Sequence, residues 1–170
     1  MKTLDSIIDE LNKLERFLID AHPLDGIFDP EDWNKFYYTD ELLEKFEQVM
    51  LMHDETMLMY LTLISSEDGL SNKYTDVLCR LLKASWHNSQ EDITEMLGDI
   101  KDPASIDALY ERALDIPEND DMRALARKCI WALLAINTPE AIKKIELLAA
   151  LDDKYISNFA AVRLGWKEDK

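Results

Sequence analysis

The stretch EDITEMLGDIKDPASIDALYERAL at residues 91–114 decides the fold, because its apolar pattern recurs 36 residues later as RKCIWALLAINTPEAIKKIELLAA at residues 127–150. Each copy holds two apolar stripes at helical spacing, separated by a capping residue and a proline: Asp102-Pro103 in the first copy and Thr138-Pro139 in the second. The paired apolar or small residues are Ile93 and Cys129, Leu97 and Leu133, Ile100 and Ile136, Ile106 and Ile142, Leu109 and Ile145, and Ala113 and Ala149. The pattern predicts a repeat of helix, tight turn and helix.

A second shift, of 31 residues, relates the helix predicted to begin at Asp121 to the end of the chain. It places Leu125, Cys129, Ile130 and Leu133 on Ile156, Ala160, Ala161 and Leu164. Gly165 then stands where a helix C-cap is expected. Because a two-helix unit cannot bury its apolar stripe alone, such units must stack on one another. We therefore predict an all-α protein, a right-handed α-α superhelix with HEAT-like helical pairs over residues 72–166.

The residues before the repeat are predicted to form an N-terminal helical cap over 1–66, within a single helical domain of residues 1–170. Apolar residues from Leu4 onward predict a helix ending near Asp20, and two further helices are expected at 40–52 and 54–66. A short helix is expected after Asp29-Pro30. In the repeat region, Ser89 is expected to start a capping box and Gly98 to close the helix that follows.

The amino-acid composition agrees with a helical protein, and its net charge limits the classes of partner that the protein can bind. The chain has only 4 glycines and 5 prolines in 170 residues, which disfavours sandwiches, barrels and phosphate-binding glycine loops. Its 35 acidic and 19 basic residues give a net charge of −16, which repels nucleic acid and anionic membranes and attracts basic partners. With no signal-peptide pattern and two isolated cysteines, Cys79 and Cys129, the chain is expected to be cytoplasmic, with reduced thiols.

Two segments of the repeat region carry a family resemblance. Residues 91–103 and 127–136 look like those of small acidic bacterial HEAT-like proteins, some of which serve as immunity proteins beside polymorphic or contact-dependent toxins. The resemblance covers residues 72–166 and implies a helical repeat fold. It also implies a protein-binding inhibitor whose partner is a cognate toxin domain. HEAT-like folds serve equally as adaptors, lyase subunits and DNA-repair glycosylases, so the fold does not choose among these activities.

The acidic charge is concentrated in zones. Residues 87–121 carry 11 acidic and 2 basic side chains, whereas residues 122–170 carry 6 and 9. In the acidic zone, carboxylates recur at every fourth position of two successive predicted helices, as Glu91, Glu95 and Asp99 and then as Asp107, Glu111 and Asp115. We call these the first and second acidic ridges. They predict a docking face for a basic partner, and a merely solvated acidic surface is the alternative.

No pattern in the sequence indicates catalytic or metal chemistry. Among the three histidines only His87 has a carboxylate, Glu91, at the i, i+4 spacing, and zinc needs three or four ligands. The acidic loop at 115–121 lacks the glycine and terminal glutamate of a calcium loop and is interpreted as a capped inter-helix loop. Both cysteines are interpreted as small core residues. We therefore expect no enzyme activity, no catalytic or metal-ligating residues and no cofactor.

Aromatic residues supply the remaining candidates for a partner surface. Trp86 and Trp131 are expected to pack in the core or between repeats. The segment 28–38 mixes aromatic and acidic residues, and within it Trp33 and Tyr37 are candidate interface anchors. The predicted partner-binding set is therefore Glu91, Glu95, Asp99, Asp107, Glu111, Asp115, Trp33 and Tyr37.

Together these observations favour an inhibitor that covers a basic toxin domain with an acidic face, as an immunity protein does. A general HEAT-like adaptor is the alternative, distinguished only by the protein it binds. A nucleic-acid-repair enzyme on the same fold would need a basic concave stripe, which the net charge of −16 disfavours. We expect no nucleic-acid or membrane binding, and a monomer or weak dimer.

Overall fold

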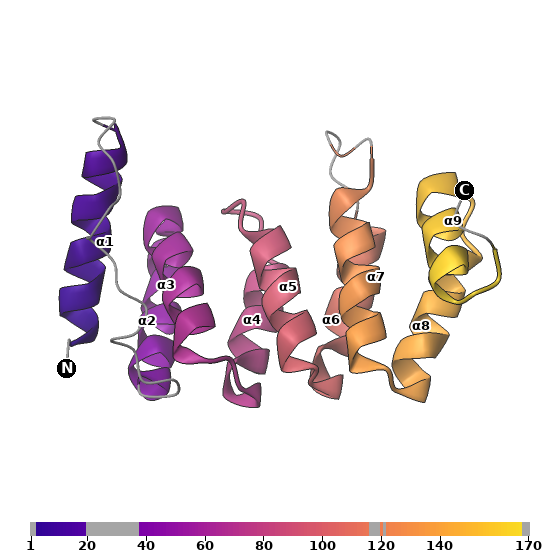
Figure 1. Cartoon of the computed structure of the whole chain (residues 1–170), viewed down its shortest axis with the longest axis horizontal. Helices are drawn as coiled ribbons and strands as arrows, with labels where there is room; N and C mark the ends of the chain where they lie inside the picture. Colours follow the sequence, from indigo (N-terminus) through magenta and orange to yellow (C-terminus); the bar gives the residue numbers. More distant parts are fainter. Residues whose placement is uncertain (1–2, 20–37, 116–119, 121, 168–170) are drawn as a thin grey trace. The chain divides into compact units, whose positions relative to one another are not determined.

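The computed structural model describes residues 3–19, 38–115, 120 and 122–167. In these residues the chain is all-α, with nine α-helices, two short 3-10 helices and no strand, as the sequence predicted (Figure 1). The short helix expected after Asp29-Pro30 lies outside the described residues. The chain divides into two compact units, Met1–Leu70 and Ser71–Lys170.

The first unit contains α1 (Leu4–Ile19), α2 (Thr39–Met52) and α3 (Glu55–Asp68). Helices α2 and α3 form a hairpin whose core includes Leu42, Phe46, Leu58 and Leu61, all fully buried. The turn between them follows from two local features: His53 adopts a left-handed conformation after α2, and the Asp54 carboxylate accepts the Met57 amide at the start of α3.

A buried carboxylate joins the two ends of this hairpin. Asp68, the last residue of α3, is fully buried, and its Oδ1 accepts the Tyr38 amide at 3.1 Å. Its Oδ2 accepts the Thr39 hydroxyl at 3.2 Å. Tyr38 is the N-cap residue of α2, so Asp68 supplies from another helix the acceptor that a local capping side chain would otherwise provide.

The second unit contains α4 (Thr75–Leu82), α5 (Gln90–Ile100), α6 (Ile106–Leu114), α7 (Ala124–Ile136), α8 (Pro139–Ala149) and α9 (Lys154–Arg163). Consecutive helices α4 and α5, α6 and α7, and α8 and α9 pack against each other. In addition α4 contacts α6, which contacts α8, and α5 contacts α7, which contacts α9. The helices therefore alternate between two layers, with α5 and α7 in front of α4 and α6 in Figure 1.

Most of the repeated apolar positions are buried in the core between these layers, whereas Ile100, Ile142 and Ala149 are half-buried. Ile93, Leu97 and Leu109 are fully buried, and so are Cys129, Leu133 and Ile145, their counterparts 36 residues later. Ile156, Ala160 and Ala161 of α9 are buried as well, in agreement with the shift of 31 residues. Burying one equivalent stripe from each successive helix is what holds the layers together.

Several predicted helix ends are confirmed. Asp102 Oδ1 accepts the Ala104 amide at 3.0 Å and Thr138 Oγ1 accepts the Ala141 amide at 3.2 Å, and in each case a proline follows the cap. Gly165, with φ of +74°, ends α9 in a Schellman motif: the Gly165 amide bonds to Val162 and the Trp166 amide to Ala161.

Two predicted helix ends and one predicted capping box were wrong. Ser89 is the N-cap residue of α5, but its side chain makes no capping hydrogen bond, and its amide, which donates to the N3 side chain in a capping box, donates instead to His87 Nδ1 at 3.1 Å. Gly98 does not close α5, which continues to Ile100 and ends with Lys101 in the left-handed conformation. Helix α7 begins at Ala124 rather than Asp121, because the Asp120 carboxylate accepts the Ala124 and Leu125 amides.

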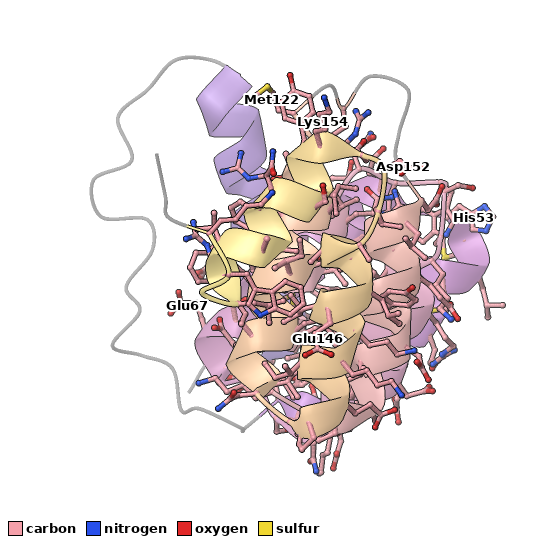
Figure 2. All side chains as sticks on the ribbon, turned by 90° about the vertical axis from the view of Figure 1, so that its right-hand side faces the viewer. His53, Glu67, Met122, Glu146, Asp152 and Lys154 are labelled. Carbon is pink, nitrogen blue, oxygen red and sulfur yellow. The ribbon has the colours of Figure 1, made fainter. Side chains whose placement is uncertain are left out.

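The last helical pair ends the second unit with polar side chains. Figure 2 shows Glu146 on the outer side of α8 and shows Asp152 and Lys154 where the chain turns into α9; all three are exposed. Within the described residues no helix combines the length and the apolar character that crossing a bilayer requires.

Candidate functional site

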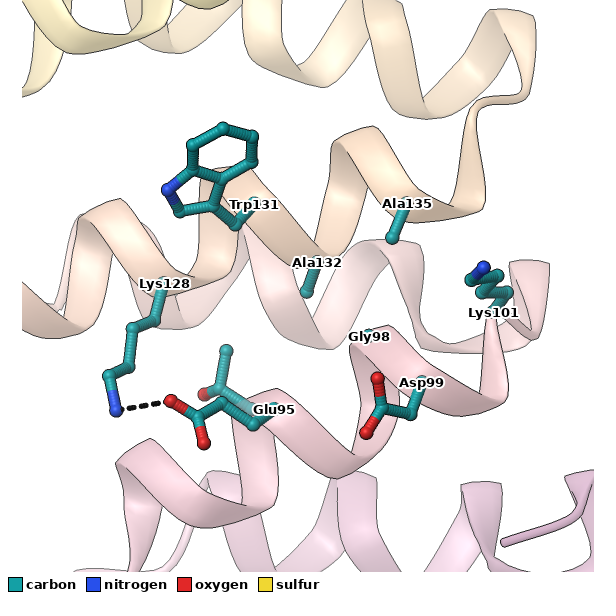
Figure 3. A pocket seen from close by; sticks show the side chains of 9 residues that line it. Glu95, Gly98, Asp99, Lys101, Lys128, Trp131, Ala132 and Ala135 are labelled. Atoms are coloured by element: carbon teal, nitrogen blue, oxygen red, sulfur yellow. Dashed lines mark hydrogen bonds and ion pairs between the residues drawn. The ribbon is translucent and has the colours of Figure 1, made fainter.

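An open groove of about 400 Å³ runs between α5 and α7 (Figure 3). Small residues from both helices form its floor, charged residues stand along the α5 side, and a tryptophan stands on the α7 side. The lining residues are Thr94, Glu95, Gly98, Asp99, Lys101, Lys128, Trp131, Ala132 and Ala135.

Gly98 sets the separation of the two helices. A Cβ built on Gly98 would lie 3.3 Å from both Cα and Cβ of Ala132, which is closer than carbon atoms normally approach. Glycine therefore allows α5 and α7 to pack closely at this point. Its role is contact between helices rather than helix termination, and a pairing with Ala132 cannot be recognised from one chain segment alone.

The first acidic ridge meets a lysine from α7. Lys128 Nζ lies 2.9 Å from a Glu91 carboxylate oxygen and 2.6 Å from a Glu95 oxygen. Partial burial lowers the pKa of Lys128, but the hydrogen bonds to Glu95 and Glu91 outweigh this effect and raise it. One cation therefore partly neutralises two of the three carboxylates in this ridge.

Asp99, the third carboxylate of the first ridge, is exposed at the groove. Among the described residues no lysine, arginine or histidine nitrogen is recorded within salt-bridge distance of it. Lys101 also lines the groove, at the end of α5. The groove thus combines an ion-paired end, at Glu95 and Lys128, with an exposed carboxylate farther along α5.

The structure does not bring the second ridge to the first. The second ridge lies on α6 and pairs within the other layer: Asp107 with Lys144 of α8 at 2.7 Å, and Glu111 with Lys83 after α4 at 2.7 Å. Asp115 pairs with Arg112 at 2.6 Å. The six carboxylates that the sequence predicted as one docking face therefore divide between two layers, each with cations of its own.

Trp131 is more exposed than its predicted packing role implies. It does contact the next helical pair, because its ring meets Phe159 of α9 edge-on at 6.1 Å and the Arg163 guanidinium lies 4.6 Å from its centre. Even so, 52% of Trp131 remains accessible. The helical spacing held a signal for this, because Arg127 and Lys128, one turn earlier, share its face of α7.

The other aromatic candidates are placed differently. Trp33 and Tyr37 lie outside the described residues. Tyr38, from the same predicted aromatic segment, is buried at the N-cap position of α2, where its amide donates to Asp68. Trp86 is half-buried and packs edge-on against the His87 ring, with 4.7 Å between ring centres.

The histidine and the two cysteines considered as reactive groups lie in surroundings typical of structural residues. His87 is buried, with Nε2 3.0 Å from the Leu81 carbonyl while Nδ1 accepts the Ser89 amide, which places the ring proton on Nε2. Burial raises the pKa of the Cys79 thiol to about 11 and that of Cys129 to about 12. Within the described ranges, no three His, Cys, Asp or Glu side chains gather as a metal site requires.

The arrangement is suited to contact with another macromolecule: an exposed indole, a groove with a floor of small residues, and charges of both signs around it. Comparison of the chain with protein-family models, with curated proteins and with solved structures found no match in any of the three. The site is therefore interpreted from its own geometry.

Proposed function

We propose that this chain is a HEAT-like helical-repeat protein that binds and inhibits another protein, as an immunity protein neutralises its cognate toxin domain. The repeat reading is supported by the alternation of α4 to α9 between two layers and by the burial of equivalent positions 36 residues apart. Stacked helical pairs expose long helix faces, which such proteins use to bind partners.

The observation that carries the proposal is the exposure of Trp131 beside the carboxylates of α5. Tryptophan is among the residue types most enriched at the energetic centres of protein interfaces. The groove is lined by two carboxylates, Glu95 and Asp99, and by two cations, Lys101 and Lys128. Two further exposed carboxylates, Glu91 and Asp92, lie one turn earlier on α5. A basic toxin surface would meet both an apolar anchor and complementary charge there.

The separation of the two ridges sharpens the test. If the α5 face docks the toxin, reversing charge with Glu95→Lys and Asp99→Lys should slow association roughly tenfold at low salt, because charge of the wrong sign removes steering. The matched control reverses Asp107 and Glu111 on α6, in the other layer, and should change the rate little. The candidate partner is any toxin domain encoded by a gene adjacent to that of this chain; the chain is first co-expressed with it, and cell survival is scored.

Three outcomes count against this proposal. Failure to protect cells from that toxin domain would reject the immunity role. Equal effects of the α5 and α6 reversals would show that the whole acidic surface, and not the groove face, attracts the partner. If Trp131→Ala changed neither the protection of cells nor the rate of binding, Trp131 would not be the anchor on which the proposal depends.

A further inference from the structure

Two arginines and two aromatic rings form a continuous cluster across α7 and α9. The Arg127 guanidinium lies 4.6 Å from the centre of the Phe159 ring. The Arg163 guanidinium lies 4.7 Å from the same ring and 4.6 Å from the centre of Trp131. We call these four residues the arginine–aromatic cluster. Arg127 and Trp131 are exposed, while Phe159 and Arg163 are half-buried.

Several other cations of this unit pair with carboxylates. Lys128 is shared by two glutamates, Lys144 pairs with Asp107, and Arg123 pairs with Asp153 at 2.8 Å. Arg127 has no recorded carboxylate within 4.0 Å among the described residues, although the chain has 35 acidic residues. Its recorded contact is with the Phe159 ring, and a cation–π contact takes up no carboxylate or carbonyl acceptor, so the guanidinium keeps N–H groups able to donate.

An arginine held over an aromatic ring in this way is prepared to bind a carboxylate. The ring contact reduces the conformational freedom that the long side chain must lose on binding, and the planar guanidinium can donate two parallel hydrogen bonds to one carboxylate. Trp131, in the same cluster, provides a broad apolar surface beside it. Arginine and tryptophan are also the two residue types that dominate the energetics of protein interfaces.

We propose that the arginine–aromatic cluster binds an acidic segment of a partner protein, with a carboxylate on Arg127 and an apolar side chain against Trp131. A protein segment fits better than a nucleic acid, because phosphate binding accumulates over many cationic contacts and the rest of this chain carries excess negative charge. The inference does not depend on the immunity role: it concerns the α7–α9 side of Trp131 and charge of the opposite sign.

The test uses the full-length chain and a defined probe, a short blocked peptide with a phenylalanine between two glutamates. The binding is followed by nuclear magnetic resonance of the ¹⁵N-labelled protein, observing the Trp131 indole N–H and the Arg127 side-chain N–H. We expect saturable shifts confined to the cluster, and binding at least about fivefold weaker for the peptide with glutamine at both glutamate positions, as loss of a charged hydrogen bond requires. Because the chain is strongly acidic, non-specific attraction of this probe is not expected.

Matched variants separate recognition from structure. Arg127→Gln should weaken binding of the glutamate peptide about fivefold or more while leaving thermal unfolding nearly unchanged, since the replaced group is exposed. Arg80→Gln, which removes an exposed arginine that pairs with Asp76 on α4, is the control and should leave the peptide affinity unchanged.

Four results would overturn the proposal: no shift at millimolar peptide, equal binding of the glutamate and glutamine peptides, tighter binding of a short oligonucleotide at the same residues, or a dimer of this chain that Arg127→Gln disrupts and the peptide does not. None of these bears on protection against a toxin, so failure here is distinguishable from failure of the proposed function.

Discussion

Gly98 of α5 packs directly against Ala132 of α7, and a Cβ on Gly98 would lie 3.3 Å from the Ala132 Cα. This close contact lies in the floor of the groove, so the geometry of the candidate site depends on residue 98 having no Cβ atom. It also explains why a glycine occupies the interior of a helix, where it costs up to about 1 kcal/mol relative to alanine.

Enlarging this residue tests the contact. Gly98→Val should lower the free energy of unfolding by about 2 kcal/mol, because the added atoms must displace the backbone of α7. Gly98→Ala should change it by less than about 1 kcal/mol, since better helix propensity offsets the close contact. Urea denaturation followed by circular dichroism measures both, with exposed Asp99→Ala as the control. A Gly98→Val protein as stable as the parent would contradict the close packing.

The buried Asp68 provides a prediction for the first unit. Asp68→Ala should lower the free energy of unfolding by about 2 to 3 kcal/mol, because it leaves the buried Tyr38 amide without this acceptor. Glu67→Ala removes an exposed carboxylate one residue earlier and should cost less than about 0.5 kcal/mol. Equal losses in the two variants, measured by urea denaturation, would show that the buried hydrogen bonds contribute little.

Asp153 predicts a pH dependence. The hydrogen bond from Arg123, followed by that from the Ile156 amide, holds the pKa of Asp153 below its ordinary value of 3.8. A lowered folded-state pKa stabilises the protein above the unfolded pKa, and the stabilisation is lost as pH falls through the folded value. Asn at this position can still cap α9, so Asp153→Asn removes mainly the charge.

We therefore expect the parent to be more stable than Asp153→Asn at about pH 6, and the difference to shrink as pH falls below about 4. Thermal unfolding of both proteins across this pH range measures the difference. Thr138→Ala, which removes an uncharged cap of α8, should show a difference from the parent that does not depend on pH in this way. A constant difference for Asp153→Asn would exclude the charged interaction with Arg123.

The thiols provide a prediction about reactivity. Burial, and then the Asp76 carboxylate, raise the pKa of Cys79, and burial raises that of Cys129, so both thiols stay protonated at neutral pH. Labelling by a disulfide reagent should be at least about tenfold slower in the folded protein than in urea, with fully buried Cys129 slower than half-buried Cys79. Cys79→Ser and Cys129→Ser variants assign the two rates. Labelling of folded Cys79 at its unfolded rate would contradict this.

The sequence by itself determined the helices of the second unit and several of their ends. Helical periodicity, the cap and proline pairs at Asp102 and Thr138, and the glycine at 165 act within a few residues of the chain, so they can be recognised without knowing the neighbours. The repeat also identified much of the core, because equivalent residues such as Leu97 and Leu133 are both fully buried, although Ile100, Ile142 and Ala149 are only half-buried.

Only the tertiary structure decided what the exposed residues face. The two acidic ridges have the same spacing on two successive helices. Because successive helices alternate between layers, the ridge on α5 lies in the layer with α7, whereas the ridge on α6 lies in the layer with α4 and α8. The lysine that pairs with Glu95 is Lys128, 33 residues away, and Trp131 is left half-exposed by the way α9 packs against α7. Gly98 acts through Ala132 on another helix. These relationships join side chains that are distant in sequence, and local periodicity carries no information about which distant partner each side chain meets.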